Sequence, residues 1–120
     1  MMKPTVLVVD DDESIRVSLK LLLEEKYNVI TVLNGEEALN KLNQMHIDAV
    51  LLDVKMNGID GLEILEKIRT QHKNIVVIML TVIEDIKTAI RAIKLGAKDY
   101  LLKPYEKKEL LLSLKKNLEL

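Results

Sequence analysis

Short apolar runs alternate along the chain with segments in which apolar residues recur every three or four positions. Short runs rich in Val, Ile and Leu are typical of buried β-strands. Strands are predicted at residues 6–9, 29–32, 49–52, 75–80 and 100–102. The run at 75–80 contains no polar residue, which is typical of a central parallel strand covered on both faces.

The segments that follow these runs carry the periodicity of amphipathic helices. The side chains predicted to face the core are those of Ile15, Leu19, Leu22 and Leu23, of Ala38, Leu39 and Leu42, of Leu62, Leu65 and Ile68, of Ile86, Ala89, Ile90 and Ile93, and of Leu110, Leu111, Leu114 and Leu118. Turn signals occur at Asn34-Gly35 and in the loop 57–61, and Gly96 is predicted to end the fourth helix.

Five strand–helix units in strict alternation predict an α/β fold, with a five-stranded parallel sheet that is doubly wound and has helices on both faces. A chain of 120 residues can bury one hydrophobic core and is too short for two domains. Because no internal repeat, linker or low-complexity tract interrupts the pattern, residues 1–120 are interpreted as one domain.

The composition narrows the class of protein. The hydrophobic fraction of 48% and the charged fraction of 31% are typical of a soluble globular chain, and the net charge of −1 favours neither nucleic-acid contact nor membrane binding. The absence of Cys excludes disulfides, thiol nucleophiles and thiolate zinc sites. The N-terminus lacks a signal-peptide core and no stretch approaches the ~18 apolar residues of a membrane span, so a cytoplasmic location is expected.

Three adjacent carboxylates, those of Asp10, Asp11 and Asp12, follow the first strand directly. Two carboxylates about 4 Å apart repel each other by roughly 4 kcal/mol at an effective dielectric constant of about 20. Such side chains therefore either point into water or surround a positive charge. Asp12 and Glu13 are interpreted as residues of a helix N-terminus, where acidic side chains are stabilised.

Asp53, Thr81 and Lys103 follow the third, fourth and fifth predicted strands. The carboxyl ends of parallel strands meet at one edge of the sheet, where ligands bind in such folds, so these side chains are expected near Asp10 and Asp11. Carboxylates suit Mg²⁺, which completes its coordination with water and phosphate oxygens. A cation, an anion site formed by Lys103 and Thr81, and a carboxylate nucleophile predict phosphoryl transfer to an Asp.

Each of these residues also has an ordinary structural explanation when it is taken alone. A single Asp after a strand is usually a turn or capping residue, and a single Thr or Lys at a strand end carries less information still. Independent capping, however, gives no reason for acids, a hydroxyl and an amine to gather at one edge, so the functional interpretation is preferred.

Four motifs resemble those of response-regulator receiver domains, the chemotaxis-protein type of two-component signalling. They are VLVVDDDESIR at 6–16, AVLLDVKMNGIDGLEIL at 49–65, VVIMLT at 76–81 and LGAKDYLLKPY at 95–105. Their order and spacing match receivers over the whole chain. The resemblance implies a flavodoxin-like sheet with strand order 2-1-3-4-5.

The resemblance also implies roles for individual residues. Asp53 is at the phosphoacceptor position, which takes a phosphoryl group from a sensor histidine kinase or phosphotransfer protein. Asp11 and Asp53 are expected to bind Mg²⁺ directly, with Asp10 acting through water and Lys55 through its backbone carbonyl. Lys103 is expected to pair with Asp53 before transfer and with a phosphoryl oxygen afterwards.

The same resemblance implies a conformational switch. The hydroxyl of Thr81 is expected to move onto the phosphoryl group, and Tyr100 is at the position of the switch aromatic, where it rotates into the vacated space. This change biases a two-state equilibrium of the face formed by helix four, strand five and helix five. The Lys103-Pro104 bond falls where receivers keep a cis peptide.

Several positions depart from the usual receiver pattern. Asn57 replaces a usual Pro, Val82 replaces a usual Ala or Gly, and Tyr105 replaces a usual Phe. Ile83 and Lys55 occupy sites that tune the lifetime of the acyl phosphate in the family. Ile83 has no polar group that could position an attacking water, so a long-lived phosphoryl group is expected.

Lys87, Arg91, Lys94 and Lys98 are expected to form a basic stripe on helix four. Such a stripe is commonly only a solvated face. With Leu112, an apolar residue of the last helix without a predicted core role, it also suggests a homodimer through helix four, strand five and helix five. The output, the cognate kinase and any longer parent regulator are not determined by this sequence.

A small Mg²⁺-dependent phosphatase of the haloacid-dehalogenase type is the alternative function. That class also places Asp, Thr or Ser, and Lys at the edge of a parallel sheet. It needs its nucleophile in a D-x-D motif after the first strand, where this chain has DDD, and it usually carries a cap domain. The receiver interpretation, in which the chain catalyses only its own phosphorylation and dephosphorylation, is therefore preferred to an enzyme with turnover.

Overall fold

Five parallel strands form the central sheet of the computed structural model, which describes residues 3–56, 59–82 and 86–118. The strand order is β2-β1-β3-β6-β7. The strands are β1 (Thr5–Val9), β2 (Asn28–Val32), β3 (Ala49–Asp53), β6 (Val76–Thr81) and β7 (Asp99–Leu102). In chain order this is 2-1-3-4-5, so the expected doubly wound topology is confirmed.

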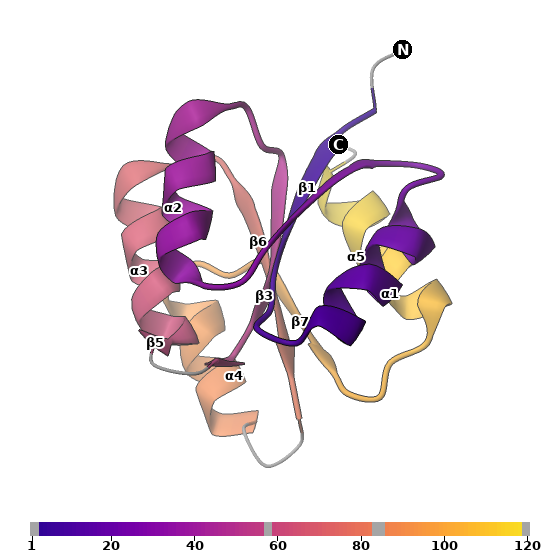
Figure 1. Ribbon diagram of the computed structural model, residues 1–120. Helices are drawn as coiled ribbons and strands as arrows, with labels where there is room; N and C mark the ends of the chain where they lie inside the picture. Colours follow the sequence, from indigo (N-terminus) through magenta and orange to yellow (C-terminus); the bar gives the residue numbers. More distant parts are fainter. Residues whose placement is uncertain (1–2, 57–58, 83–85, 119–120) are drawn as a thin grey trace.

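Helices cover both faces of the sheet (Figure 1). One face carries α1 (Glu13–Leu23) and α5 (Lys107–Leu118), and the other carries α2 (Gly35–Gln44), α3 (Gly61–Gln71) and α4 (Ile86–Lys94). Each side has its own apolar cluster, because alternate residues of every strand point to opposite faces. Within the described ranges, no helix has both the length and the apolar character needed to cross a membrane.

A short antiparallel hairpin lies in the segment that the sequence predicts as a loop between the third strand and the third helix. It consists of β4 (Lys55–Met56) and β5 (Ile59–Asp60). The hairpin could not be expected from the sequence because two-residue strands leave no periodic signal. It begins two residues after Asp53, the last residue of β3.

The orientation of α4 differs from the predicted one. Ala89 and Ala92 are fully buried, whereas Ile90 and Ile93 are 47% and 39% exposed although both were expected to face the core. Small side chains let a helix approach the sheet closely, which explains why the alanine face is the buried one. The helical stripe of Ile residues is therefore largely an outer surface of the molecule.

The helix ends follow the capping signals of the sequence. Asp12 accepts hydrogen bonds from the backbone N–H of Ser14 at 2.8 Å and of Ile15 at 3.4 Å, which confirms its capping role. Gly96 has a φ of 110° just after α4, as expected of a C-terminal glycine. Because α4 ends at Lys94, Lys98 lies outside the helix and the predicted basic stripe is shorter than expected.

Candidate functional site

The polar strand-end residues do meet at one edge of the sheet. Register places Val9 beside Leu52, Asp53 beside Leu80 and Thr81 beside Leu102. Asp10, Asp53, Thr81 and Lys103 therefore end or follow four adjacent strands at their carboxyl ends. The strand order reverses at β1 and β3, which is where ligands bind in doubly wound sheets.

Lys103 forms an ion pair with Asp53. Its Nζ lies 3.1 Å from Asp53 Oδ2, and the two side chains are only 24% and 13% exposed. The backbone N–H of Lys103 donates to the carbonyl oxygen of Thr81 at 2.6 Å, which ties the segment after β7 to the end of β6. A positive charge is thus held beside the carboxylate that the family resemblance predicts to be the phosphoacceptor.

Asp10 is the most buried acidic residue of the site, with 1% exposure. Its Oδ1 accepts a hydrogen bond from the backbone N–H of Asp12 at 2.9 Å, but its Oδ2 is buried and has no hydrogen-bond partner in the part of the chain that the structure describes. Burial raises the pKa of Asp10, and the charge of Asp53 raises it further, while the Asp12 N–H and Lys103 oppose the shift. The site therefore holds a buried carboxylate oxygen without a hydrogen-bond donor among the described residues.

A divalent cation fits this uncompensated oxygen. In the part of the chain that the structure describes, no three Asp, Glu or His side chains are arranged to hold a metal ion on their own. Mg²⁺ does not require such a cluster, because it usually binds one or two carboxylates and keeps several waters. Asp10, the exposed Asp11 and Asp53 follow or end the adjacent strands β1 and β3 and carry carboxylate oxygens of the kind that Mg²⁺ binds, and the backbone carbonyl of Lys55 in β4 is the fourth predicted donor.

The hydroxyl of Thr81 is almost completely buried and donates to the carbonyl oxygen of Val82 at 3.2 Å. Tyr100 in β7 is half-buried and packs against the apolar cluster on the α2–α4 side. The structure thus places Thr81 at the site edge and Tyr100 one strand away, on β7. Asn57 and Ile83, two positions that the sequence singles out, lie outside the described residues.

Tyr105, which the sequence marks only as a departure from the usual Phe, follows Lys103-Pro104 at the edge of the candidate site. Burial raises its pKa, and the charges of Asp10 and Asp53 raise it further. It also lines a cavity of about 360 Å³ between α1 and the segment joining β7 to α5, together with Lys103 and Pro104. The expected cis peptide is present between these last two residues.

Gly61, the first residue of α3, is a second residue whose role appears only in the structure. A Cβ atom built there would lie 2.7 Å from the carbonyl oxygen of Val54 and 2.8 Å from that of Asp53. Only glycine therefore lets α3 begin against the backbone that carries Asp53. A glycine at a helix start was the only signal in the sequence.

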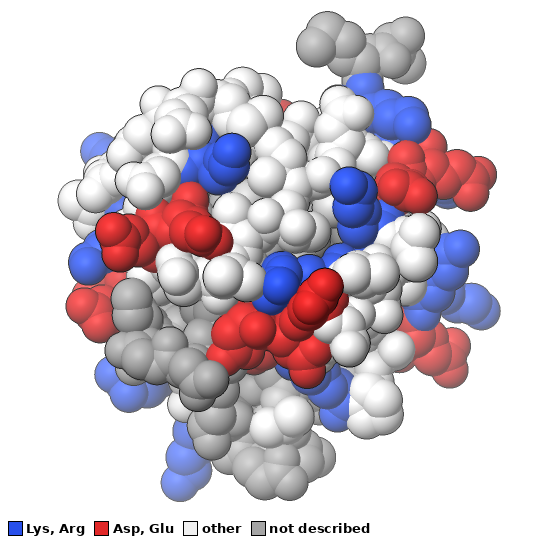
Figure 2. All heavy atoms as spheres, in the orientation of Figure 1, with Lys and Arg blue, Asp and Glu red and all other residues white. Residues whose placement is uncertain are grey.

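The surface charge agrees with the low net charge of the chain. Figure 2 shows acidic and basic side chains interspersed over the face viewed in Figure 1. The described residues on this face do not form an extended basic surface of the kind that favours contact with nucleic acid.

Comparisons with known proteins agree with this geometry. A family model described as the response regulator receiver domain matches residues 6–115. The alkaline phosphatase synthesis transcriptional regulatory protein PhoP of Bacillus subtilis is 38% identical over 109 residues, which cover 90% of this chain and 45% of PhoP. The chain spans 25% to 46% of the length of the curated relatives that it matches.

Solved structures show the same fold at full length. The receiver domain of NtrX from Brucella abortus has a TM-score of 0.91 and 34% identity, with 95% of this chain and 98% of that chain covered. The chemotaxis protein CheY4 of Vibrio cholerae has a TM-score of 0.90 and 32% identity, with 97% and 99% covered.

Proposed function

This chain belongs to the response regulator receiver domain family, and we propose that residues 1–120 act as one receiver that accepts a phosphoryl group on Asp53. Membership makes it a signalling domain of two-component systems rather than a metabolic enzyme. The donor is the phosphohistidine of a sensor histidine kinase or of a phosphotransfer protein. Because that chemistry takes place in the cytoplasm, it agrees with the location expected from the sequence.

In the proposed transfer, a carboxylate oxygen of Asp53 attacks the phosphorus of the phosphohistidine. A P–O bond forms while the P–N bond breaks, and the imidazole of the donor leaves with the electron pair of that bond. The product is an acyl phosphate on Asp53. Hydrolysis by water later returns the free carboxylate and inorganic phosphate, so no oxidant or further cosubstrate is needed.

The ion pair between Lys103 and Asp53 is the observation that best supports this proposal. Lys103 holds the carboxylate in place before transfer and can then neutralise a phosphoryl oxygen at the same position. Receiver domains generally bind Mg²⁺, and when bound here it would neutralise charge on the carboxylates and the phosphoryl oxygens. Asp10, Asp11, Asp53 and the Lys55 carbonyl are the proposed ligand set, with Asp10 acting through water.

The proposed switch begins at Thr81, whose hydroxyl donates to the carbonyl oxygen of Val82 at 3.2 Å. The phosphoryl group adds a charge of about −1.5 to −2 and strong acceptor oxygens, which favour reorientation of the hydroxyl toward it. Tyr100 then moves into the space left behind, and the face of α4, β7 and α5 shifts to a second conformation.

This α4–β7–α5 face is the proposed contact for an output domain or partner protein. It exposes the cations Lys87, Arg91 and Lys94 around Ile90 and Ile93 on α4. Exposed apolar residues surrounded by charges are typical of protein contacts. A second copy of the chain is one such partner, as the sequence suggests.

Phosphorylation with acetyl phosphate tests the proposal directly. With Mg²⁺, we expect intact-protein mass spectrometry to show one phosphoryl group per chain on Asp53 and none on the Asp53→Asn variant. Asp12→Asn, which keeps a capping side chain, is the matched control and should be labelled normally. Repeated turnover of p-nitrophenyl phosphate, or labelling that persists in Asp53→Asn, would favour the haloacid-dehalogenase alternative or another acceptor.

A further inference from the structure

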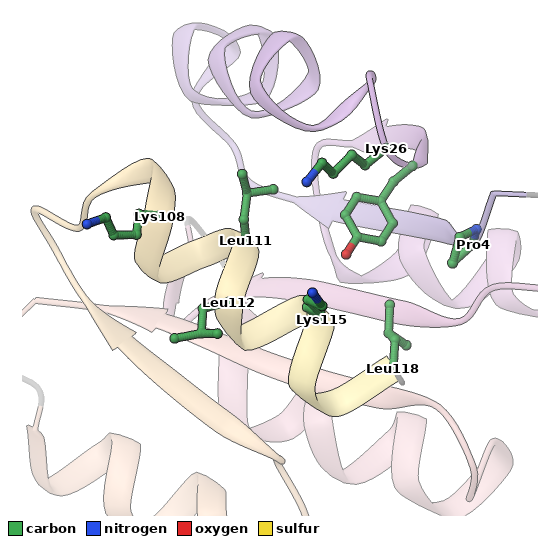
Figure 3. Close-up of a pocket in the computed structure, with 8 residues that line it drawn as sticks. Pro4, Lys26, Lys108, Leu111, Leu112, Lys115 and Leu118 are labelled. Carbon is green, nitrogen blue, oxygen red and sulfur yellow. The ribbon is translucent and has the colours of Figure 1, made fainter. Parts of the chain in front are cut away.

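A groove lies between α5 and the corner that joins α1 to β2, on the helical layer opposite α4 (Figure 3). Pro4, at the start of β1, lines it, so the groove is at the far end of the strand from Asp10 and Asp53. It has a volume of about 550 Å³. We refer to it as the α5 groove.

The α5 groove combines an apolar surface with positive charge. Tyr27, Leu111, Leu112 and Leu118 supply the apolar part, and the three charged lining residues are Lys26, Lys108 and Lys115. Among the described residues that line it, none is acidic. Leu112 is 60% exposed, which is among the highest values for large apolar side chains in the described part of the chain.

The three lysines have no counterion in the described part of the chain. None of their Nζ atoms forms a hydrogen bond or an ion pair there, whereas Lys116, on the same helix, pairs with Asp99 at 3.7 Å. Three like charges around one groove repel each other and are each fully available to an anionic ligand. Charge and apolar surface together therefore favour an occupant that carries both carboxylates and apolar side chains.

The spacing of the lysines and leucines along α5 indicates how charged and apolar side chains are arranged on the bound segment. Lys108 and Lys115 are seven residues apart, which corresponds to two helical turns or roughly 10 Å, and Leu111 and Leu112 lie midway between them. A helix packed alongside α5 presents side chains with the same period. Carboxylates seven residues apart would then face the two lysines while an apolar pair covers the leucines.

We propose that the α5 groove binds an acidic amphipathic helix of a partner protein, with two carboxylates one heptad apart that flank a central apolar pair. Affinity comes from covering Leu112 and its apolar neighbours, and selectivity comes from the lysines. The site uses a different side of the molecule from the α4 surface with Ile90 and Ile93. It does not depend on phosphorylation of Asp53.

Two synthetic helical peptides with the same leucines, one with Glu and one with Lys at the flanking positions, provide the probes. We expect saturable fluorescence-polarisation binding of the Glu peptide and at least about tenfold weaker binding of the Lys peptide. In ¹⁵N-labelled protein, the amide shifts should centre on Leu111 and Leu112. Reversing both charges, Lys108→Glu with Lys115→Glu, should invert the preference between the two peptides.

The double variant Lys87→Glu with Lys94→Glu has the same net charge and alters the α4 surface instead, so it is the matched control and should bind like the wild type. Circular dichroism of both double variants checks that they fold. The proposal is overturned by equal binding of the two peptides, by equal losses in the two double variants, or by no saturable binding up to about 1 mM. A concentration-dependent mass increase lost in Leu112→Glu would instead assign the groove to a second copy.

Discussion

Asp53 Oδ2 and Lys103 Nζ lie 3.1 Å apart although fifty positions separate the two residues in the chain. The distance is set by the strands, because Asp53 ends β3 and Lys103 follows β7 with only β6 between them. The pair is mostly shielded from water, so its attraction is screened less than that of a surface pair. It links the candidate nucleophile to the segment that leads into α5.

Replacing Lys103 should slow phosphorylation. Lys103→Met keeps the apolar stem but removes the charge that can neutralise a phosphoryl oxygen, so we expect the rate of labelling by acetyl phosphate to fall at least about tenfold. Lys98→Met removes an equal charge from an exposed position outside the site and should label at the wild-type rate. Equal rates in the two variants would contradict a direct role for Lys103.

Replacing Asp10 should stabilise the protein in the absence of Mg²⁺. Burial raises the folded-state pKa of this carboxyl, so its ionised form costs stability above that pKa. Asp10→Asn removes this cost, and we expect a gain of about 1–3 kcal/mol in the free energy of unfolding at pH 7. The gain should disappear as the pH falls through the folded pKa of Asp10 toward its unfolded value of about 3.9.

The same unfolding measurement, made after chelation by EDTA and again after readdition of Mg²⁺, tests for the metal. A ligand present at about 100 times its Kd stabilises the folded state by about 2.7 kcal/mol, so Mg²⁺ should raise the urea midpoint of the wild type. Asp10→Asn should respond less because it lacks one carboxylate. Asp12→Asn should respond like the wild type, and an equal response in all three proteins would place Mg²⁺ elsewhere.

Substituting Gly61 should destabilise the fold near Asp53. In Gly61→Ala the new Cβ meets two backbone carbonyl oxygens that cannot rotate away, so we expect a loss of about 1–3 kcal/mol in urea denaturation. At Gly35, which begins α2, the atoms in the way belong to the side chain of Ile64 and can move. Gly35→Ala should therefore cost less than Gly61→Ala, and the reverse order would show that the backbone after β3 adapts.

A buried hydrogen bond fastens α5 to β7. The hydroxyl of Ser113, which is 3% exposed, donates to Asp99 Oδ2 at 2.7 Å. Ser113→Ala leaves that carboxylate with one donor fewer, and we expect a loss of about 1–2 kcal/mol in the free energy of unfolding. Ser18→Ala on the exposed side of α1 is the control and should stay within about 0.5 kcal/mol of the wild type.

Beryllofluoride, which mimics the phosphoryl group, should promote a dimer through the α4–β7–α5 face. We expect the mass in analytical ultracentrifugation to rise with beryllofluoride and Mg²⁺, and Ile90→Glu to prevent this by placing a charge in the contact. Leu21→Glu places the same charge on the exposed side of α1, outside this face, and should still dimerise. An unchanged mass in the wild type would restrict this face to other partners.

The sequence alone was enough to predict the parallel sheet and to name the residues that lie at its carboxyl edge. Short runs of Val, Ile and Leu favour buried strands, and the alternation of strands and helices favours parallel pairing, which brings the ends of distant strands together. The side chains of Asp10, Asp53, Thr81 and Lys103 could therefore be assigned to one site before any distance was known. The family resemblance was based on the residues of the four motifs and on their order along the chain, and it needed no structural information.

The tertiary structure decided everything that depends on how closely the elements approach. Periodicity places Ile90 and Ile93 on one face of a helix. It cannot show that α4 packs on the sheet through Ala89 and Ala92 instead, because the burial of each side chain is set by contacts with neighbouring elements. Asp10 Oδ2 is likewise left without a hydrogen-bond donor among the described residues only because packing removes the water around it. Local sequence indicates where the main strands and helices form. The burial of a side chain, and with it the pKa of a group such as the Asp10 carboxyl, depends on how the elements pack together.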